Sequence, residues 1–565
     1  MELKKREVRF FLNIIFPLVF ILNLKAQFIS PVLHELRFSG LYGELRPNHF
    51  HNGIDLKINR AVKDNYAVAI MDGIIRRINV APDGYGNMLI IDHPNGYSSL
   101  YAHLDRFSPD IERYVRDIQI MNQNFEMDLD SLNIAVVQGQ IVGYIGNSGS
   151  SNGPHLHFEI LNTISGNSYN PQIFGIKIRD TISPVLQKIK IVGIDEDFNT
   201  LNSKVYNIKK SKPDSFTIGS DTIKYGADNI GIEIMGYDMV NGSTNHNGIF
   251  KISILVDSFP VFAFNMENID GKQLSSYKAH IDQKEFLRTG YIYHRLFVLP
   301  GNALNIYDIK SDMAVIKLDT NISKKIEIIA EDFDGNKSVL KFNLIKDSVM
   351  LKSDKLIYNH FITLGQKYEI SDPDYIIRAG DNCFFKNTYL SVIKKDSSGY
   401  SHSIDISINK DAFKNSIDLY IKPIKTDKYF DKMCIVRIDG GKRKNIGGIF
   451  KDGYMFAKIG EEGTYKIMAD SIKPTLKPRN LKSNMKKSDR IIFSVTDNFS
   501  SGLTVPHLKA DGYIDGEWVL FEYDKKYKNL THKFDKNLKP GKHSLKLIVT
   551  DTKGNAAVYN KTFIK

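Results

Sequence analysis

The sequence predicts an almost entirely β-sheet protein that is divided into several domains. Short runs of alternating apolar and polar residues recur along the chain, separated by turn sequences such as the one at residues 83–87, DGYGN. Alternation with a period of two is the pattern of half-buried strands. At 565 residues the chain is also long for one core, since a domain usually holds roughly 100–200 residues. Two sequence patterns occur twice after residue 175, which indicates repeated β modules.

The first residues have the features of an export signal. Lys4, Lys5 and Arg6 give a positive start, residues 10–24 are mostly apolar, and Ala26 supplies the small residue of a cleavage site. This apolar run is shorter than the roughly 20 residues that span a bilayer. The sequence therefore predicts a signal peptide over residues 1–26 and no transmembrane segment after its removal. The mature protein is then expected in the periplasm, in the cell envelope or outside the cell; an uncleaved N-terminal anchor is the alternative.

The stretch that carries most information on function is GPHLHFE, at residues 153–159. In a strand, alternate side chains share a face, so His155 and His157 point the same way, with apolar residues behind them. The glycine-rich run over residues 139–153 leaves space for the backbone of another molecule. An H-x-H pair alone is weak evidence, because such histidines are more often ordinary core or surface residues.

Two upstream motifs strengthen the case for a site. If the segment HNGID is extended, His51 and Asp55 share a face, and Gly53 between them removes a side chain that would crowd the gap. His103 follows an alternating, strand-like run. Together the motifs supply four histidines and one aspartate near strand ends. That inventory fits a catalytic zinc site, which takes three protein ligands and leaves one position for water. The spacing does not say which histidine of the H-x-H pair would bind metal.

The order of these motifs resembles that of the lysostaphin-type (LytM-like) zinc metallopeptidases. H-x-G-x-D, Y-A-H-L, G-Q-x-V-G-Y-I-G-N-S-G and G-P-H-L-H-F-E follow one another between residues 40 and 175, about a quarter of the chain. The resemblance implies a LytM-like metallopeptidase β-fold (a duplicated hybrid motif) and hydrolysis of peptide stems or crosslinks of peptidoglycan. It also implies one Zn2+ per chain, held by His51, Asp55 and His157, with His103 and His155 as the active-site histidines that do not bind metal.

All five positions are filled, which favours an active enzyme. Zinc lowers the pKa of a bound water towards about 7 and polarises the scissile carbonyl, and His103 or His155 would then exchange a proton with the reacting groups. His49 is a further candidate ligand, but it lacks an aspartate at the right distance. One alternative is a non-catalytic envelope protein that uses the same fold to bind or activate another cell-wall hydrolase. Another keeps the chemistry but cuts glycine-rich proteins or peptides.

An insertion separates the second and third motifs. The 35 residues between His103 and Gly139 replace a connection that is short in the resembling family. The part that begins at Pro109 predicts a short helix, and Asp128 and Asp130 form an acidic patch. The insertion over residues 104–138 is a candidate to line or shade the cleft.

The remainder of the chain is rich in predicted strands and contains a repeat. D-x-I-x-P starts at Asp180 and again at Asp470, and a strand followed by D-x-x-G-N occurs at residues 332–336 and 551–555. Proline-marked linkers indicate semi-independent modules, and the D-x-x-G-N sequence predicts a hairpin turn. The predicted domains are 27–178 (metallopeptidase), 179–346 (immunoglobulin-like, with an insertion), 347–469 (β-rich, of uncertain type) and 470–565 (immunoglobulin-like β-sandwich). The sandwich topology stays open, because the Cys and Trp hallmark pattern is missing.

Charge and cysteine content bear on partners. The overall net charge of +12 is unevenly distributed. Residues 27–175 carry −5, whereas residues 176–565 carry +14. The basic part suits an anionic envelope polymer, although a lysine- and asparagine-rich composition from an AT-rich genome explains it equally well. No nucleic-acid motif is present, so the predicted partners are the peptidoglycan peptide and envelope proteins that bind the C-terminal modules. Cys383 and Cys434 are the only cysteines, and either a disulfide or two free buried thiols is consistent with the sequence.

Overall fold

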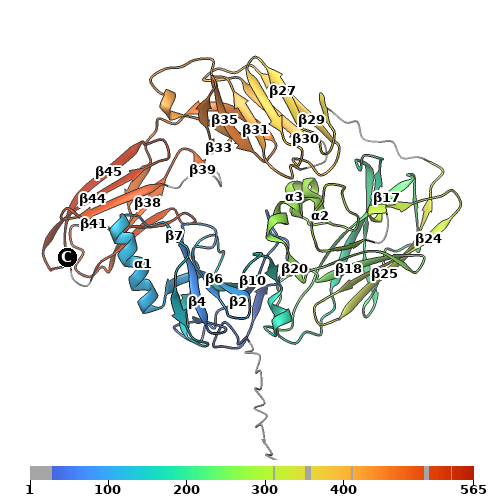
Figure 1. Ribbon diagram of the computed structural model, residues 1–565, viewed down its shortest axis with the longest axis horizontal. Coiled ribbons are helices and arrows are strands. Elements are labelled where there is room, and N and C mark those ends of the chain that lie inside the picture. Colours follow the sequence, from blue (N-terminus) through green and yellow to red (C-terminus); the bar gives the residue numbers. More distant parts are fainter. Residues whose placement is uncertain (1–27, 310–311, 350–357, 409–411, 502–507, 536–537) are drawn as a thin grey trace, which may run out of the picture.

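The computed structural model describes residues 28–309, 312–349, 358–408, 412–501, 508–535 and 538–565. The structure consists mainly of β-strands, which confirms the predicted all-β class. We name four parts after the predicted domains: the N-terminal region (28–178), the second region (179–346), the third region (358–469) and the C-terminal region (470–565). They follow one another around a ring (Figure 1). The predicted signal peptide lies outside the described residues. No helix within them is both long and apolar enough to cross a membrane.

The N-terminal region is built on a 12-stranded sheet. Its main path is β1 (Phe38–Gly40), β2 (Ile54–Lys57), β10 (His155–Asn162), β6 (Tyr97–Phe107), β5 (Asn87–Asp92), β4 (Gly73–Val80) and β7 (Met127–Leu129). Five short strands pair beside it: β3 (Tyr66–Val68), β8 (Ile134–Val136), β9 (Ile141–Ile145), β11 (Ser168–Tyr169) and β20 (Asn268–Ile269). Strand β10 lies between β2 and β6, and Leu156, Phe158 and Ile160 on one face of it are fully buried. This leaves the opposite face for the histidines, as the alternation predicts.

A β-bulge in β6 lies beside β10. Asn87 pairs with Leu104, and Leu89 pairs with Tyr101. The one residue between Asn87 and Leu89 therefore opposes two residues of β6. One of these two is His103, whose φ angle of 60° lies in the left-handed region. An extra residue in one strand re-aims the side chains around it, and this bulge changes the face to which His103 points.

The insertion after the Y-A-H-L motif begins with a helix, as predicted. Helix α1 (Pro109–Asn122) is longer than the expected short helix, starts at a proline and buries Ile111 and Val115. The acidic patch is paired with arginines, because Arg77 binds Asp128 and Arg76 binds Asp130, with N–O distances of 2.7 and 2.9 Å.

The second region contains a 5-stranded and an 8-stranded sheet. The first consists of β13 (Thr200–Asn207), β12 (Val185–Ile194), β17 (Asn229–Tyr237), β21 (His294–Arg295) and β23 (Ile316–Lys317). The second consists of β14 (Lys209–Lys212), β15 (Ser215–Thr217), β16 (Thr222–Tyr225), β25 (Lys337–Lys346), β24 (Ser323–Glu331), β18 (Lys251–Val256), β19 (Phe259–Asn265) and β22 (Tyr307–Ile309). Short helices α2 (Tyr277–His280) and α3 (Gln283–Thr289) lie in the same region.

The first two regions are not semi-independent, which differs from the expectation drawn from the proline-marked linker. Tyr42, Leu45 and Phe50 of the N-terminal region belong to the hydrophobic core of the second region. Strand β20 of the second region also pairs with β11 and so extends the N-terminal sheet. Apolar side chains of a loop are buried wherever a core is within reach, and the linker sequence carries no information on this.

The third region also consists of two sheets, which enclose one core. Their strands are β26 (His360–Ile362), β29 (Thr388–Lys395), β30 (Ser403–Ile408), β36 (Gly463–Ala469), β32 (Met433–Asp439) and β33 (Lys442–Gly447) in one sheet, and β27 (Tyr368–Asp372), β28 (Tyr375–Ala379), β31 (Ile417–Ile421), β35 (Tyr454–Ile459) and β34 (Ile449–Lys451) in the other. Strand β39 (Ser500–Ser501) of the C-terminal region pairs with β33 and extends the first of these sheets. Cys383 and Cys434 are both free and buried, so the structure favours two buried thiols over a disulfide.

The C-terminal region packs two 4-stranded sheets around one core. One consists of β37 (Thr475–Pro478), β38 (Arg490–Thr496), β43 (Asn529–Lys533) and β42 (Glu522–Asp524), the other of β41 (Glu517–Val519), β40 (Lys509–Ile514), β44 (Lys542–Thr550) and β45 (Ala556–Ile564). Both predicted hairpins are present, β24–β25 and β44–β45, and Gly335 and Gly554 in their turns have φ angles of 91° and 74°. The immunoglobulin-like assignment of this region and of the second region stays a prediction.

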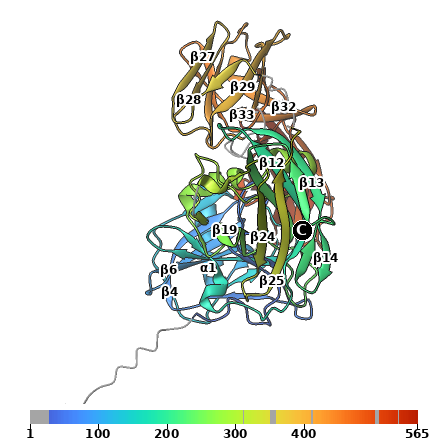
Figure 2. The same cartoon turned by 90° about the vertical axis from the view of Figure 1, so that its right-hand side faces the viewer.

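The C-terminal region returns to the N-terminal region and closes the ring. Arg116 on α1 lies 3.7 Å from Glu522 on β42. Lys526, in the turn that follows β42, donates from Nζ to the carbonyl oxygens of Asn147 and Ser151, at 2.7 and 2.9 Å. The strands of the C-terminal region lie beside α1 in Figure 1, and Figure 2 shows the third region above the other regions. Residues at the end of the chain therefore hold a glycine-rich loop near its beginning.

Candidate active site

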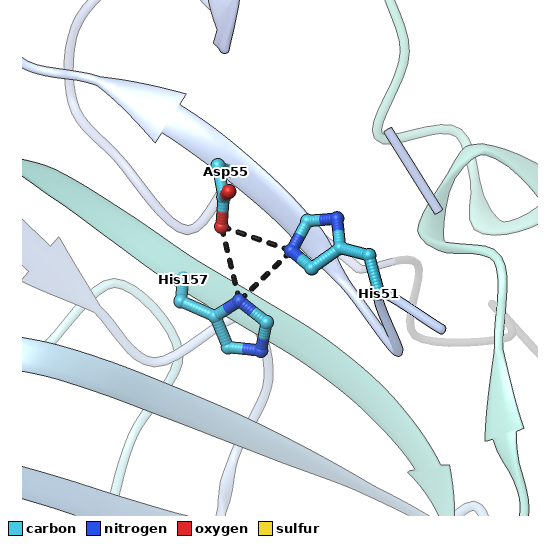
Figure 3. Close-up of side chains that lie close together, drawn as sticks. All are labelled: His51, Asp55 and His157. Carbon is cyan, nitrogen blue, oxygen red and sulfur yellow. Dashed lines mark hydrogen bonds and ion pairs between the residues drawn. The ribbon is translucent and has the colours of Figure 1, made fainter. Parts of the chain in front are cut away.

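The three residues predicted to hold a metal come together in one place. His51 Nε2, Asp55 Oδ1 and His157 Nδ1 lie 3.0 Å from one another (Figure 3). The pairing of β2 with β10 sets this geometry, because Asp55 lies directly opposite His157. His51 lies before β2, which begins at Ile54, and not on an extended strand as expected. Gly53 allows the close approach of β10, since a Cβ there would lie 2.3 Å from the carbonyl oxygen of Phe158.

Each of the three side chains is oriented by a second hydrogen bond. His51 Nδ1 donates to the carbonyl oxygen of Leu41 at 2.7 Å. His157 Nε2 donates to Glu159 Oε1 at 2.8 Å. Arg46 donates to the outer oxygen of Asp55, also at 2.8 Å. These bonds place His51 Nε2 and His157 Nδ1 so that they face the carboxylate, and such outer partners fix the orientation of metal-binding histidines.

The arrangement requires a positive charge at its centre. All three residues are more than nine-tenths buried, and lone pairs that face one another at 3.0 Å repel unless a proton or a cation lies between them. Burial lowers the pKa of His157, but Asp55 and Glu159 raise it to about 9, so a proton can take this place. Two imidazole nitrogens and one carboxylate oxygen are also the donors of catalytic zinc sites. The residues therefore fit a zinc ion.

His103 and His155 lie beside this group. The ring centroids of these two residues are 4.9 Å apart, and His155 Nε2 lies 3.4 Å from Asp55 Oδ1. His155 Nδ1 lies 2.8 Å from the carbonyl oxygen of Gly153, and His103 Nδ1 donates to that of Ser148 at 2.9 Å. For His103 this leaves the Nε2 atom as the proton acceptor, whereas His155 Nε2 faces the Asp55 carboxylate. Burial, together with His157 and His155, lowers the pKa of His103 to about 3, which keeps its ring neutral.

The five residues line a cleft of about 1290 Å3. Its walls come from the segment that precedes β2, the turn at Gly84 and Tyr85, the glycine-rich loop before β10, and Leu274 of the second region. None of the residues that line it among the described parts of the chain belongs to the insertion over 104–138. The insertion instead contacts the C-terminal region through α1, so the suggestion that it shades the cleft is not supported.

Sequence reasoning did not assign Glu159, Tyr85 or Arg46. Glu159 accepts hydrogen bonds from His157 and from the Tyr85 hydroxyl, the second at 2.5 Å. Glu159 could have been found, because it follows His157 by two residues on the same face of the strand. The other two come from segments that are irregular in sequence. His49 is exposed, its Nδ1 contacts the Asn48 side chain, and it does not belong to the metal-binding group.

The site thus defines a class: a β-sheet protein with a zinc-type His-Asp-His group and two further histidines in an open cleft. Residues 49–123 match Peptidase family M23, and residues 359–470, the segment whose type the sequence left open, match the Zu5-like domain. The match to Peptidase family M23 and the relatives of similar sequence below confirm the predicted resemblance to lysostaphin-type metallopeptidases for the N-terminal region.

Relatives with similar sequence include the DD-carboxypeptidase/endopeptidase Mpg of Neisseria meningitidis serogroup B, which is 33% identical over 143 residues. That alignment covers 25% of this chain and 24% of the relative. An uncharacterized metalloprotease of Haemophilus influenzae is 26% identical over 150 residues, which are 26% of this chain and 25% of the relative. The chain thus covers about a quarter of the length of these curated relatives.

Among solved structures, the catalytic domain of lysostaphin from Staphylococcus simulans is 23% identical. The alignment covers 25% of this chain and 91% of that domain, with a TM-score of 0.19. The catalytic domain of the M23 protein EnpA from Enterococcus faecalis is 24% identical, with 25% of this chain and 95% of that chain covered and the same TM-score of 0.19.

Proposed function

We propose that this protein is an exported zinc metallo-endopeptidase that hydrolyses peptide stems or crosslinks of bacterial peptidoglycan. One observation carries the proposal: three metal-type donor atoms lie 3.0 Å apart beside the imidazole rings of His103 and His155, all in one cleft. The size of the cleft, about 1290 Å3, suits a peptide attached to a polymer better than a small molecule.

His51, Asp55 and His157 are the residues that would hold the zinc ion. When bound, zinc supplies Lewis acidity and makes water nucleophilic at neutral pH. Other residues of the chain orient these three ligands. Glu159 and the carbonyl oxygen of Leu41 fix the two imidazole rings, and Arg46 binds the Asp55 carboxylate and partly neutralises its charge.

His103 and His155 are proposed to handle protons at their Nε2 atoms. The Nδ1–H of each ring is engaged by a backbone carbonyl, so Nε2 is the atom through which each ring exchanges a proton with the attacking water or the leaving amine. A protonated Nε2 also stabilises the charge that develops on the carbonyl oxygen of the substrate.

The proposal includes export of the protein to the cell envelope. Peptidoglycan lies there, so this location agrees with the proposed substrate. Export and this location rest on the N-terminal sequence and on the basic composition after residue 175. The C-terminal β modules then contact the envelope or other envelope proteins. The names of the Neisseria relatives, which describe a DD-carboxypeptidase and endopeptidase, support peptide hydrolysis by the N-terminal region.

The test combines metal analysis with digestion of purified peptidoglycan. The full-length protein should hold one zinc and release fragments that mass spectrometry assigns to cleaved peptides. His51→Ala and Asp55→Ala should remove both zinc and activity, whereas His49→Ala should retain zinc. His103→Ala and His155→Ala should keep zinc and lose roughly two to four orders of magnitude in turnover. Full zinc content in the two ligand variants refutes the metal site, and zinc binding without cleavage of any peptide favours the non-catalytic alternative.

A further inference from the structure

Two groups of three aspartates recur at equivalent positions in the second and C-terminal regions. The carboxylate oxygens of Asp180, Asp238 and Asp332 lie within 4.8 Å of one another. The second group is Asp470, Asp497 and Asp551, whose carboxylate oxygens also lie within 4.8 Å of one another. In both, the first aspartate starts the D-x-I-x-P linker, the second ends or follows a strand, and the third opens the D-x-x-G-N hairpin turn. The proposed peptidase activity uses neither group.

The first group has carboxylate oxygens that are buried and without partners. Asp238 is 2% exposed and Asp180 is 8% exposed. Asp180 Oδ1 accepts from the backbone N–H groups of Thr181, Ile182 and Asn241, at 2.7 to 3.2 Å, whereas its Oδ2 has no partner. Asp238 Oδ1 likewise has no partner. A buried oxygen of this kind costs free energy unless a ligand that the described chain lacks satisfies it.

The charge of the first group is also uncompensated. Within the described residues, no lysine or arginine forms an ion pair with any of its three aspartates. Lys177 lies close by but binds Asp334, at 3.6 Å. Burial, followed by the charges of Asp332 and Asp180, raises the pKa of Asp238 to about 8. Three carboxylates without a counter-charge are therefore either partly protonated or bound to a cation.

The second group repeats this construction in detail. Asn336 holds both oxygens of Asp332, at 2.8 and 2.6 Å, and donates to the backbone oxygen of Asp180 at 3.2 Å. Asn555 does the same for Asp551, at 2.8 and 2.7 Å, and for the backbone oxygen of its linker aspartate at 2.8 Å.

The middle aspartate of the second group, Asp497, is half-buried, and its Oδ1 is again a buried oxygen without a partner among the described residues. The second group differs in that Asn498 forms a hydrogen bond with the Asp470 side chain and Lys432 contributes a positive charge near it. The recurrence of one arrangement in two separate cores indicates a common ligand.

We propose that each aspartate group binds a hard divalent cation, with calcium as the preferred ion. Ca2+ binds oxygen ligands at about 2.3–2.6 Å, so two of its ligands lie at most about 5 Å apart, and the carboxylate oxygens of each group are close enough to share one ion. Three aspartates supply anionic oxygens, and backbone oxygens and water complete a coordination shell of six to eight. Imidazole and thiolate ligands are absent from both groups, which separates them from the zinc-type site.

The position of the groups gives the cations a structural role. Asp180 lies on the linker that leaves the N-terminal region, and Asp470 lies on the linker that leaves the third region. In each case the other two aspartates belong to the end of the following sheet sandwich. A cation therefore fixes the linker to the module that follows and holds successive regions at one angle.

The test measures calcium binding to the zinc-loaded full-length protein by equilibrium dialysis, together with thermal unfolding in the presence and absence of CaCl2. Two calcium ions per chain are expected, and Asp238→Asn and Asp497→Asn should each lose one. Calcium at about 100 times its Kd should raise the Tm of the wild type by roughly 5–10 °C. Asp319→Asn changes an exposed aspartate of the second region and should behave as the wild type does.

The outcomes show whether a cation or a proton balances the charge of the aspartates, and in which group. A wild-type protein that binds no calcium overturns the proposal whether or not the variants fold, and the same protein should then gain stability at neutral pH from Asp238→Asn. A single bound ion that is lost only in Asp497→Asn overturns the assignment of the first group. A single ion lost only in Asp238→Asn overturns that of the second group. Magnesium in place of calcium, at equal occupancy and equal Tm shift, overturns the preference for calcium.

Discussion

Replacing Phe50 by alanine tests whether the core of the second region holds the metal-binding segment in place. Phe50 has no exposed surface, lies in that core, and contacts the ring of His280 with a centroid distance of 5.6 Å. The next residue in the chain is His51, whose backbone N–H donates to the carbonyl oxygen of Glu44 at 2.8 Å. Loss of the phenyl ring therefore removes the anchor next to one proposed ligand.

The size of the effect follows from the burial. A fully buried Phe→Ala change costs about 3–5 kcal/mol of unfolding free energy. Disturbing the groups that orient a metal ligand typically costs about 10- to 100-fold in metal affinity. Phe50→Ala should therefore lower both the stability of the second region and the zinc affinity of the N-terminal region.

The assay needs urea unfolding and a zinc competition titration with a chromogenic chelator. Phe262→Ala is the matched control, because Phe262 is 1% exposed in the same core and lies on β19, away from the metal-binding segment. It should lose similar stability and retain its zinc affinity. Equal zinc affinities in the two variants would refute the reasoning, since packing in the second region would then not position His51.

Three further predictions concern other contacts. Glu159→Gln should lower zinc affinity about 10- to 100-fold in the same titration, because the anionic partner of a metal-type imidazole is lost; unchanged affinity contradicts the role of Glu159. Burial lowers the pKa of His294 to about 4 and that of His280 well below its usual value. The unfolded chain therefore binds protons below about pH 6.5 that the folded chain rejects, so the free energy of unfolding should fall as the pH drops from 6.5 to 4, by up to about 1.4 kcal/mol per pH unit and histidine, and the Tm should fall with it; His294→Asn should flatten this profile. Lys526→Met should reduce the hydrogen-exchange protection of the glycine-rich loop, whereas the exposed Lys542→Met should not; equal protection in both refutes the contact.

The sequence was informative where chemistry depends on local spacing. The alternation in β10 placed His155 and His157 on one face, and the structure has Asp55 directly opposite His157. The helix that starts at Pro109 and both D-x-x-G-N hairpins were also predictable, because a proline at a helix start and a glycine with positive φ act within a few residues. The roles of these residues in metal binding stay proposals.

The sequence was uninformative where the position of a residue depends on distant segments. The bulge that turns His103 towards the site depends on how β5 and β6 align, and no residue type in β6 indicates it. The sequence gives no sign that Phe50 belongs to any core but that of its own domain, yet it lies in the core of the second region and contacts the ring of His280. Such contacts join residues more than 200 positions apart, and a single sequence without relatives does not encode which apolar surfaces meet.

The closure of the ring sets an order in time for the assembly of the cleft. Lys526 follows Ser151, whose carbonyl oxygen it holds, by 375 residues. At a synthesis rate of about 5–20 residues per second, this separation corresponds to about 20–75 s. The histidines of the site are made early, but the loop beside them receives its last hydrogen bonds when translation is nearly complete. A chain that ends before the final hundred residues contains every proposed catalytic group but lacks Lys526 and its two hydrogen bonds to the loop. The cleft is therefore complete only when nearly the whole polypeptide has been made.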